Sequence, residues 1–191
     1  MSNILDNNPH RNDRLSIEII ADAPLPELHW YDSIQRAAAA ALDYRGFAFG
    51  EVGIRITNDN EIRLINRVHL GHDYETDVIS FGYFADAPRI EGELAVSLET
   101  AQRAAEELAW PAEHELLLYV VHGTLHLTGM DDQAPQGRRS MRAAEIGVMR
   151  KLGIEMTDAV GPDAVDAHAG ESNSHEPDSG QATTDRSEVK K

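Results

Sequence analysis

The chain has 191 residues, of which 41% are hydrophobic, and a formal net charge of −16 at pH 7. This length and apolar content suit one domain with a genuine core, and the acidity argues against broad electrostatic attraction to nucleic acid. Cysteine is absent, which excludes disulfides and thiolate metal sites, so a bound metal would need histidine and carboxylate ligands.

Hydrophobic periodicity and the proline and glycine breaks divide the chain into strands and helices. Alternating or short apolar runs predict strands at 15–21, 50–57, 77–81 and 92–97. Helical spacing and capping residues predict helices at 27–46, 58–66, 98–109, 112–128 and 135–152. Segment 67–76 is expected to be an irregular polar loop, and 84–90 a turn. The order of elements predicts an α/β fold of the α+β type, with a small mixed sheet covered by helices.

The ends of the chain differ in composition from the predicted domain at 15–155. Residues 1–14 are polar and are expected to form a flexible leader, and 156–191 a disordered acidic tail with few large apolar side chains. The most apolar run, 116–121, is too short to cross a bilayer and is assigned to the core. Without any signal-peptide pattern, we expect a soluble, cytoplasmic protein that makes no membrane contact.

The most informative segment runs from His122 to Asp132 and reads His-Gly-Thr-Leu-His-Leu-Thr-Gly-Met-Asp-Asp. Residues four apart share one face of a helix, so His122 and His126 can bind the same metal ion. Gly129 can end the helix and turn the chain, which lets Asp131 or Asp132 return as a third ligand. Three protein ligands with one open position are typical of a catalytic metal site.

The histidine pair has two other interpretations. A bare pair at this spacing is more often two buried, hydrogen-bonded core histidines, but Gly129 and the following aspartates favour the metal site. A metallopeptidase of the zincin type needs glutamate directly after the first histidine, and this chain has Gly123 there.

The same segment closely resembles the signature of the YbeY family, bacterial metal-dependent endoribonucleases that mature ribosomal RNA. That signature is His-Gly-x-Leu-His-Leu-x-Gly-Tyr-Asp-His, and its three histidines bind zinc. The chain matches it at His122, Gly123, Leu125, His126, Leu127, Gly129 and Asp131. Further family blocks are matched in order by 76–81 (Thr-Asp-Val-Ile-Ser-Phe) and echoed by 92–97 and by Ile65-Asn66. The resemblance covers roughly residues 15–153.

The resemblance implies a single-strand-specific endoribonuclease that acts in 3′-end maturation of small-subunit ribosomal RNA and in ribosome quality control. It implies one Zn²⁺ per chain, or another divalent transition metal, that activates water or helps a ribose 2′-OH attack a phosphodiester. The implied partners are single-stranded or ribosomal RNA and small ribosomal subunit proteins, and no DNA is expected.

Two departures from the family pattern bear on this activity. The third signature histidine aligns with Asp132, and a carboxylate can also bind zinc. Its negative charge should lower the Lewis acidity of the bound metal and make the site less selective for zinc. An arginine that the family usually carries before the Thr-Asp-Val block is replaced by Leu70. Because of these departures, a non-catalytic, metal-stabilised ribosome-assembly factor is the alternative function.

The remaining candidate site residues come from the resemblance and from the polar loop. Catalytic candidates are Asp131, Thr76, Asp77 and Ser80, of which the last three are equally well explained by structural hydrogen bonds. Candidates for substrate contact are Arg67, His69 and His72, which could take over phosphate contact from the missing arginine. The resemblance itself assigns that role to none of them. Glu93 is expected in a polar network or at the surface, and Arg138, Arg139 and Arg142 are expected on a solvated helix face.

Overall fold

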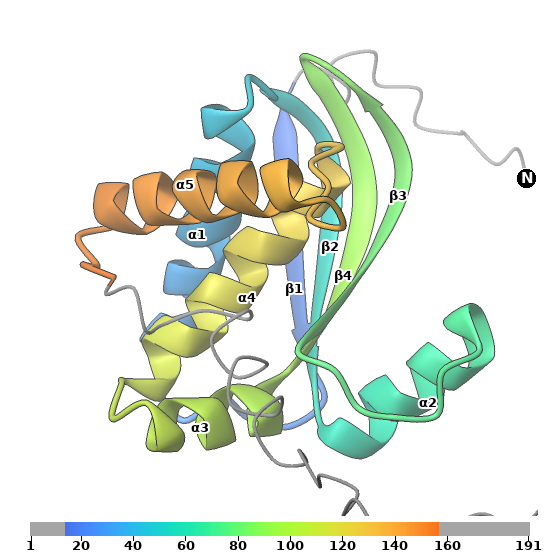
Figure 1. Cartoon of the computed structure of the whole chain (residues 1–191), viewed down its shortest axis with the longest axis vertical. Coiled ribbons are helices and arrows are strands. Elements are labelled where there is room, and N and C mark those ends of the chain that lie inside the picture. Colours follow the sequence, from blue (N-terminus) through green and yellow to red (C-terminus); the bar gives the residue numbers. More distant parts are fainter. Residues whose placement is uncertain (1–13, 157–191) are drawn as a thin grey trace, which may run out of the picture.

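The computed structural model describes residues 14–156, which form a four-stranded sheet with helices packed mainly on one face (Figure 1). The strands are β1 (Leu15–Ala21), β2 (Phe49–Thr57), β3 (Val78–Asp86) and β4 (Arg89–Ser97). The helices are α1 (His29–Tyr44), α2 (Asp59–Leu70), α3 (Leu98–Glu107), α4 (Ala112–Leu127) and α5 (Pro135–Lys151). Nearly all of the predicted leader and tail lies outside the described residues.

The sheet is mixed, with strand order β1-β2-β4-β3. Strands β1, β2 and β4 are parallel neighbours, and β3 runs antiparallel to β4 at one edge. The predicted fold class is therefore confirmed: within residues 14–156 the domain has a four-stranded mixed sheet and five helices.

Two boundaries were predicted wrongly. The expected turn at 84–90 is mostly strand, because β3 and β4 continue their pairing until Asp86 faces Arg89 across a tight connection. The outer half of β3 faces solvent and so lacks the alternation from which strands are recognised. Helix α2 extends four residues past Asn66, to a C-terminal cap at Gly71 whose φ of 77° favours glycine.

Helix α4 is the centre of the core. Leu116 to Val121 are all buried, so the helix is apolar on every side, as expected for one enclosed by protein. It contacts α1, α3 and α5 as well as strands β3 and β4. The segment 116–121 was assigned to the core from the sequence, and it lies on the same central helix as His122 and His126.

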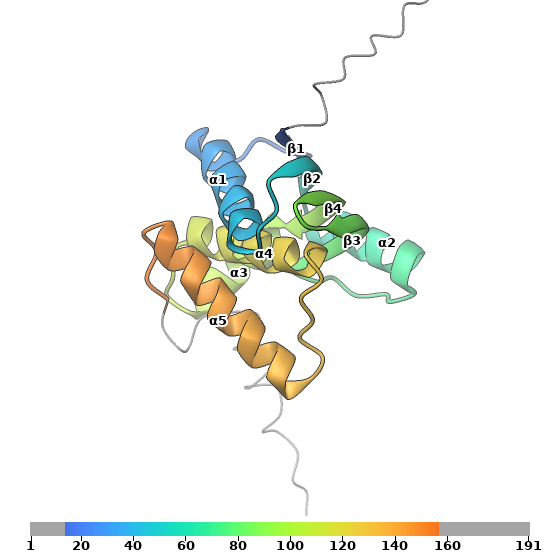
Figure 2. The ribbon, with the colours of Figure 1, turned by 90° about the horizontal axis from the view of Figure 1, so that it is seen from above.

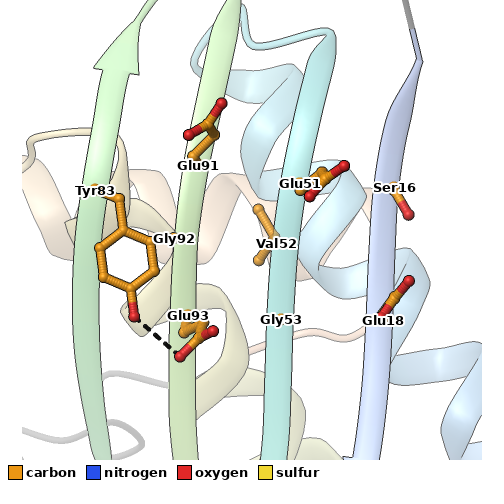
Figure 3. Close-up of a pocket in the computed structure, with 9 residues that line it drawn as sticks. All are labelled: Ser16, Glu18, Glu51, Val52, Gly53, Tyr83, Glu91, Gly92 and Glu93. Atoms are coloured by element: carbon orange, nitrogen blue, oxygen red, sulfur yellow. Dashed lines mark hydrogen bonds between the residues drawn. The ribbon is translucent and has the colours of Figure 1, made fainter. Parts of the chain in front are cut away.

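The two faces of the sheet differ. Leu94 and Val96 of β4 join the main core, whereas Ala95 points to the other face and packs with Ile62 of α2. Figure 2 shows α2 and the other helices on different sides of the sheet. The rest of the second face is open and carries four carboxylates, Glu18, Glu51, Glu91 and Glu93, around a shallow hollow (Figure 3). Within residues 14–156, no helix is long and apolar enough to cross a membrane.

Candidate metal centre

Three potential ligand atoms converge at the C-terminal end of α4. The Nε2 atoms of His122 and His126 lie 3.0 Å apart, and Oδ2 of Asp132 lies 3.6 Å from each of them. Two ligands at about 2.0–2.1 Å from a tetrahedral Zn²⁺ would be about 3.3 Å apart. The three residues can therefore hold one metal ion with little movement.

The hydrogen bonds of the two imidazoles support the same conclusion. Nδ1 of His122 lies 2.7 Å from Oε1 of Glu145, and Nδ1 of His126 lies 2.9 Å from the carbonyl oxygen of Met130. Both partners are acceptors, so in the neutral rings the proton sits on Nδ1 and both Nε2 atoms carry lone pairs. Two lone pairs that face each other at 3.0 Å repel, and a cation between them turns this repulsion into coordination.

The electrostatic surroundings of His122 favour positive charge. Burial lowers the pKa of His122, but the hydrogen bond and charge of Glu145, with the charges of Asp77 and Asp132, outweigh that effect and raise it overall. A site that stabilises an imidazolium also stabilises a metal cation, so protons and metal should compete for it.

A turn after α4 places Asp132. Gly129, with φ of 86°, ends the helix, and the amide of Met130 donates to the carbonyl of Leu125 at 3.2 Å. Arg138 then donates through Nη1 to the carbonyl oxygens of Asp132 (3.2 Å) and Gln133 (2.7 Å). Arg138 is exposed, as expected for a solvated helix face, and it also stabilises the turn that carries Asp132.

Asp131 takes a different role from Asp132. Its Oδ1 accepts a hydrogen bond from the amide of Gln133 at 3.0 Å, and the residue is exposed. It does not belong to the group of three convergent ligands in the described structure. The geometry therefore brings Asp132, rather than Asp131, to the two histidines.

A hollow of about 480 Å³ opens beside the histidines, within the size range of small-ligand pockets (about 300–1,000 Å³). Its walls come from α2, the loop before β3, β3 itself, α4 and the turn after it. The lining residues are Asn66, Leu70, His72, Tyr74, Thr76, Asp77, Val78, Ile79, Ser80, Gly82, His122, His126, Leu127 and Gln133.

Thr76, Asp77 and Ser80 line this hollow and also make local hydrogen bonds. Oδ1 of Asp77 accepts from the Thr76 hydroxyl and from the amide of Val78, both at 2.8 Å. The Ser80 hydroxyl donates to the carbonyl of Gly123 at 3.1 Å. Gly123 permits this close helix–strand contact, because a Cβ there would lie 2.7 Å from Cγ2 of Val78.

The candidates for substrate contact divide into two groups. His72 lines the hollow, as does Leu70, the residue that the resemblance aligns with a family arginine. Arg67 and His69 are not among the lining residues: Arg67 lies 3.7 Å from the carboxylate of Asp73, and His69 packs edge-on against Phe81. The sequence placed all four in one loop, whereas the structure puts Arg67, His69 and Leu70 on α2 and only His72 in the loop after it.

Comparison with known proteins identifies the family. A sequence model of the family described as endoribonuclease YbeY matches residues 18–153. The chain belongs to this family. It is 52% identical over 125 residues to endoribonuclease YbeY of Rhodopirellula baltica, which is 64% of each chain. It is 33% identical over 153 residues to that of Heliobacterium modesticaldum, covering 72% of this chain and 92% of the relative.

A solved structure supports the fold. The solution structure of a Thermotoga maritima protein aligns with a TM-score of 0.52 and 22% identity, over 72% of this chain and 92% of that one. At this identity the likeness concerns the fold alone. The YbeY-family domain thus accounts for nearly all of the described residues.

The sequence interpretation missed two buried carboxylates of this YbeY-family domain. Glu145 of α5 is 3% exposed and accepts a hydrogen bond from His122. The sequence could have indicated this residue, because it is an acidic side chain on the helix face that carries Met141 and Val148. Glu115 of α4 is 1% exposed, and burial raises its pKa to about 7 although a hydrogen bond from Tyr119 opposes the rise.

Glu93, Arg139 and Arg142 are not among the three convergent ligands of the metal centre. Glu93 is on the open sheet face, where it accepts a hydrogen bond from the Tyr83 hydroxyl at 3.0 Å (Figure 3). Nη1 of Arg142 lies 3.4 Å from Oε2 of Glu145, so it pairs with the carboxylate that holds His122. Arg139 is exposed and donates to Gln136 on its own helix.

Proposed function

We propose that this protein is a metal-dependent endoribonuclease that cuts single-stranded RNA in the cytoplasm. Its role would be 3′-end maturation of small-subunit ribosomal RNA and ribosome quality control, together with small ribosomal subunit proteins. The observation that carries the proposal is the convergence of His122, His126 and Asp132 beside a hollow, in a chain of the endoribonuclease YbeY family. The relatives' name supports RNA phosphodiesters as the substrate.

Zn²⁺ is the proposed cofactor, and in such a site it supplies an activated water and neutralises charge on a phosphate oxygen. His122, His126 and Asp132 would hold it. Glu145 and the Met130 carbonyl keep the protons on Nδ1, so that both Nε2 lone pairs point into the site. Asp132 brings a negative charge that a third histidine would not, so we expect weaker activation of water than in a three-histidine site.

We further propose that Thr76, Asp77 and Ser80 line the path of the substrate. The hydroxyls of Thr76 and Ser80 already donate, to Asp77 and to the Gly123 carbonyl, but their oxygens can still accept. A ribose 2′-OH is a donor that would suit them. Asp77 would act indirectly, by fixing the Thr76 hydroxyl and the start of β3.

The test compares wild type with His126→Ala in metal content and in cleavage of single-stranded RNA, duplex RNA and casein. His29→Ala is the matched control, because His29 is an exposed histidine on α1 that pairs with Glu113. We expect bound metal and cleavage of single-stranded RNA in wild type and His29→Ala, and loss of both in His126→Ala. If freshly purified wild type holds no metal and takes up none on titration, the proposal is wrong.

A second candidate function is a metal-stabilised ribosome-assembly factor without catalysis. It is favoured by Leu70, which lines the hollow where arginine is expected, and by the open acidic sheet face, which suits a basic protein. Bound metal without cleavage of any of the three substrates would support it. Cleavage of casein alone would support a peptidase.

A further inference from the structure

The loop between α2 and β3 presents two aromatic rings to the metal-site hollow. The rings of His72 and Tyr74 are nearly parallel, with planes 12° apart and centroids separated by 5.4 Å. Both residues line the same hollow as His122 and His126. Tyr74 is 55% exposed, so much of its ring is available to a ligand.

Two contacts with α2 stabilise the loop that carries these rings. Asn66, only 2% exposed, donates through Nδ2 to the carbonyl oxygen of Tyr74 at 3.0 Å. Nε of Arg63 donates to Oδ1 of Asp73 at 2.9 Å, between the two rings in sequence. The loop backbone and the contact between the two rings are therefore in place before a ligand arrives, which lowers the entropy that binding must overcome.

The charges around the hollow limit which part of an RNA can bind there. None of the residues lining it is lysine or arginine, and Asp77 adds a carboxylate. Leu70 contributes apolar surface and is 52% exposed. Outside the metal centre, these walls offer phosphate no fixed positive charge. They suit the uncharged part of a nucleotide, whose face stacks on aromatic rings.

We propose that His72 and Tyr74 form a stacking platform for one unpaired nucleobase next to the scissile phosphate. This inference rests on the proposed ribonuclease function and assigns a base-binding subsite to it. The base would extend the existing two-ring stack while the phosphate lies at the metal centre in the same hollow. Because paired bases are already stacked within the duplex, the platform also gives a physical reason for cutting single strands.

The test measures binding of a short unstructured RNA to the zinc-loaded protein. A 2-aminopurine base, whose fluorescence is quenched by stacking, is moved through the RNA, and parallel RNAs carry one abasic residue at each position. Gels run on the same samples show how much RNA was cut. Wild type is compared with Tyr74→Ala, Tyr74→Phe and Tyr83→Ala. Tyr83 is the matched control, an exposed tyrosine that lines the hollow on the open sheet face.

Stacking of a base on an aromatic side chain corresponds to about 5- to 150-fold in affinity. We expect Tyr74→Ala to weaken binding of intact RNA within this range and to abolish quenching at one position. Tyr74→Phe and Tyr83→Ala should bind as wild type does. An abasic residue at the quenched position should weaken wild type but not Tyr74→Ala, because the lost contact is the same.

The outcomes separate the platform from the proposed function. If wild type cuts the RNA but Tyr74→Ala binds as tightly as Tyr83→Ala, the platform is wrong and the ribonuclease function stands. The platform is also wrong if Tyr74→Ala weakens every abasic RNA as much as the intact one. If zinc-loaded wild type neither binds nor cuts RNA, the function and the platform fall together.

Discussion

Glu145 should set the affinity of the metal centre although it is not itself a ligand. It is 3% exposed, its Oε1 lies 2.7 Å from Nδ1 of His122, and its Oε2 lies 3.4 Å from Nη1 of Arg142. This carboxylate fixes the tautomer and orientation of the ring and makes Nε2 a stronger donor to metal. Removing it should therefore weaken metal binding while all three ligands remain.

The size of the effect follows from the contacts that each variant keeps. Loss of such a partner typically costs 10- to 100-fold in metal affinity, or about 1.4–2.7 kcal/mol. Glu145→Gln keeps an acceptor oxygen for His122 and loses only the charge, so we expect about tenfold. Glu145→Ala also leaves the buried Nδ1–H of His122 without its partner, so we expect about 100-fold.

The assay is competition between the protein and a fluorescent zinc chelator, with Glu106→Gln, an exposed carboxylate on α3, as the control. Thermal unfolding of each metal-free variant shows whether the domain still folds. Zinc binding by folded Glu145→Ala as tight as that by Glu106→Gln would refute this role of Glu145. Packing alone would then be sufficient to orient His122.

Two further predictions concern the third ligand and the second buried acid. Asp132→His should bind zinc at least as tightly as wild type and Asp132→Ala more weakly, and equal losses would show that this turn cannot place an imidazole on the metal. Because burial raises the pKa of Glu115 to about 7, the folded protein keeps a proton that the unfolded chain loses near pH 4.5. Stability should therefore fall between these pH values by up to about 3 kcal/mol. In urea unfolding, Glu115→Gln, which resembles the protonated form, should match wild type near pH 4 and exceed it at pH 8; a gap independent of pH would contradict this.

The sequence predicted those parts of the fold that depend on local pattern. The helix that carries His122 and His126 was found because a long apolar run indicates burial, and the strand at 15–21 because its side chains alternate between partly buried and exposed. The outer half of β3 was missed because its strand conformation comes from pairing with β4, which lies beyond Pro88 in the chain. Pairing across a sheet leaves no periodic signal in a segment that faces solvent.

The candidate site was predictable to a similar extent. The histidine spacing and Gly129 indicate a metal-binding turn, and the resemblance favours Asp132 over Asp131 because Asp132 occupies the signature position. The structure adds the contacts that hold the turn, in which Asp131 accepts from the amide of Gln133 and Arg138 donates to the carbonyl of Asp132. Glu145 lies 23 residues from His122, and only the packing of α5 on α4 brings them together. Such long-range contacts can be found only from the tertiary structure, whereas the His122 and His126 pair can be predicted from the spacing of one helical turn.

The two departures from the family signature change the charge of the site in the same direction. By the resemblance, Asp132 replaces a histidine and adds a negative charge beside the two histidines, and Leu70 replaces an arginine that would place a positive charge in the hollow. Each change weakens the attraction for phosphate, in a chain whose net charge is already −16. If RNA binds here as proposed, it would need affinity from contacts that do not depend on charge. The aromatic pair in the loop after α2 offers such a contact in the hollow. Under the proposed function, the platform of His72 and Tyr74 would therefore supply affinity that Leu70 and Asp132 do not.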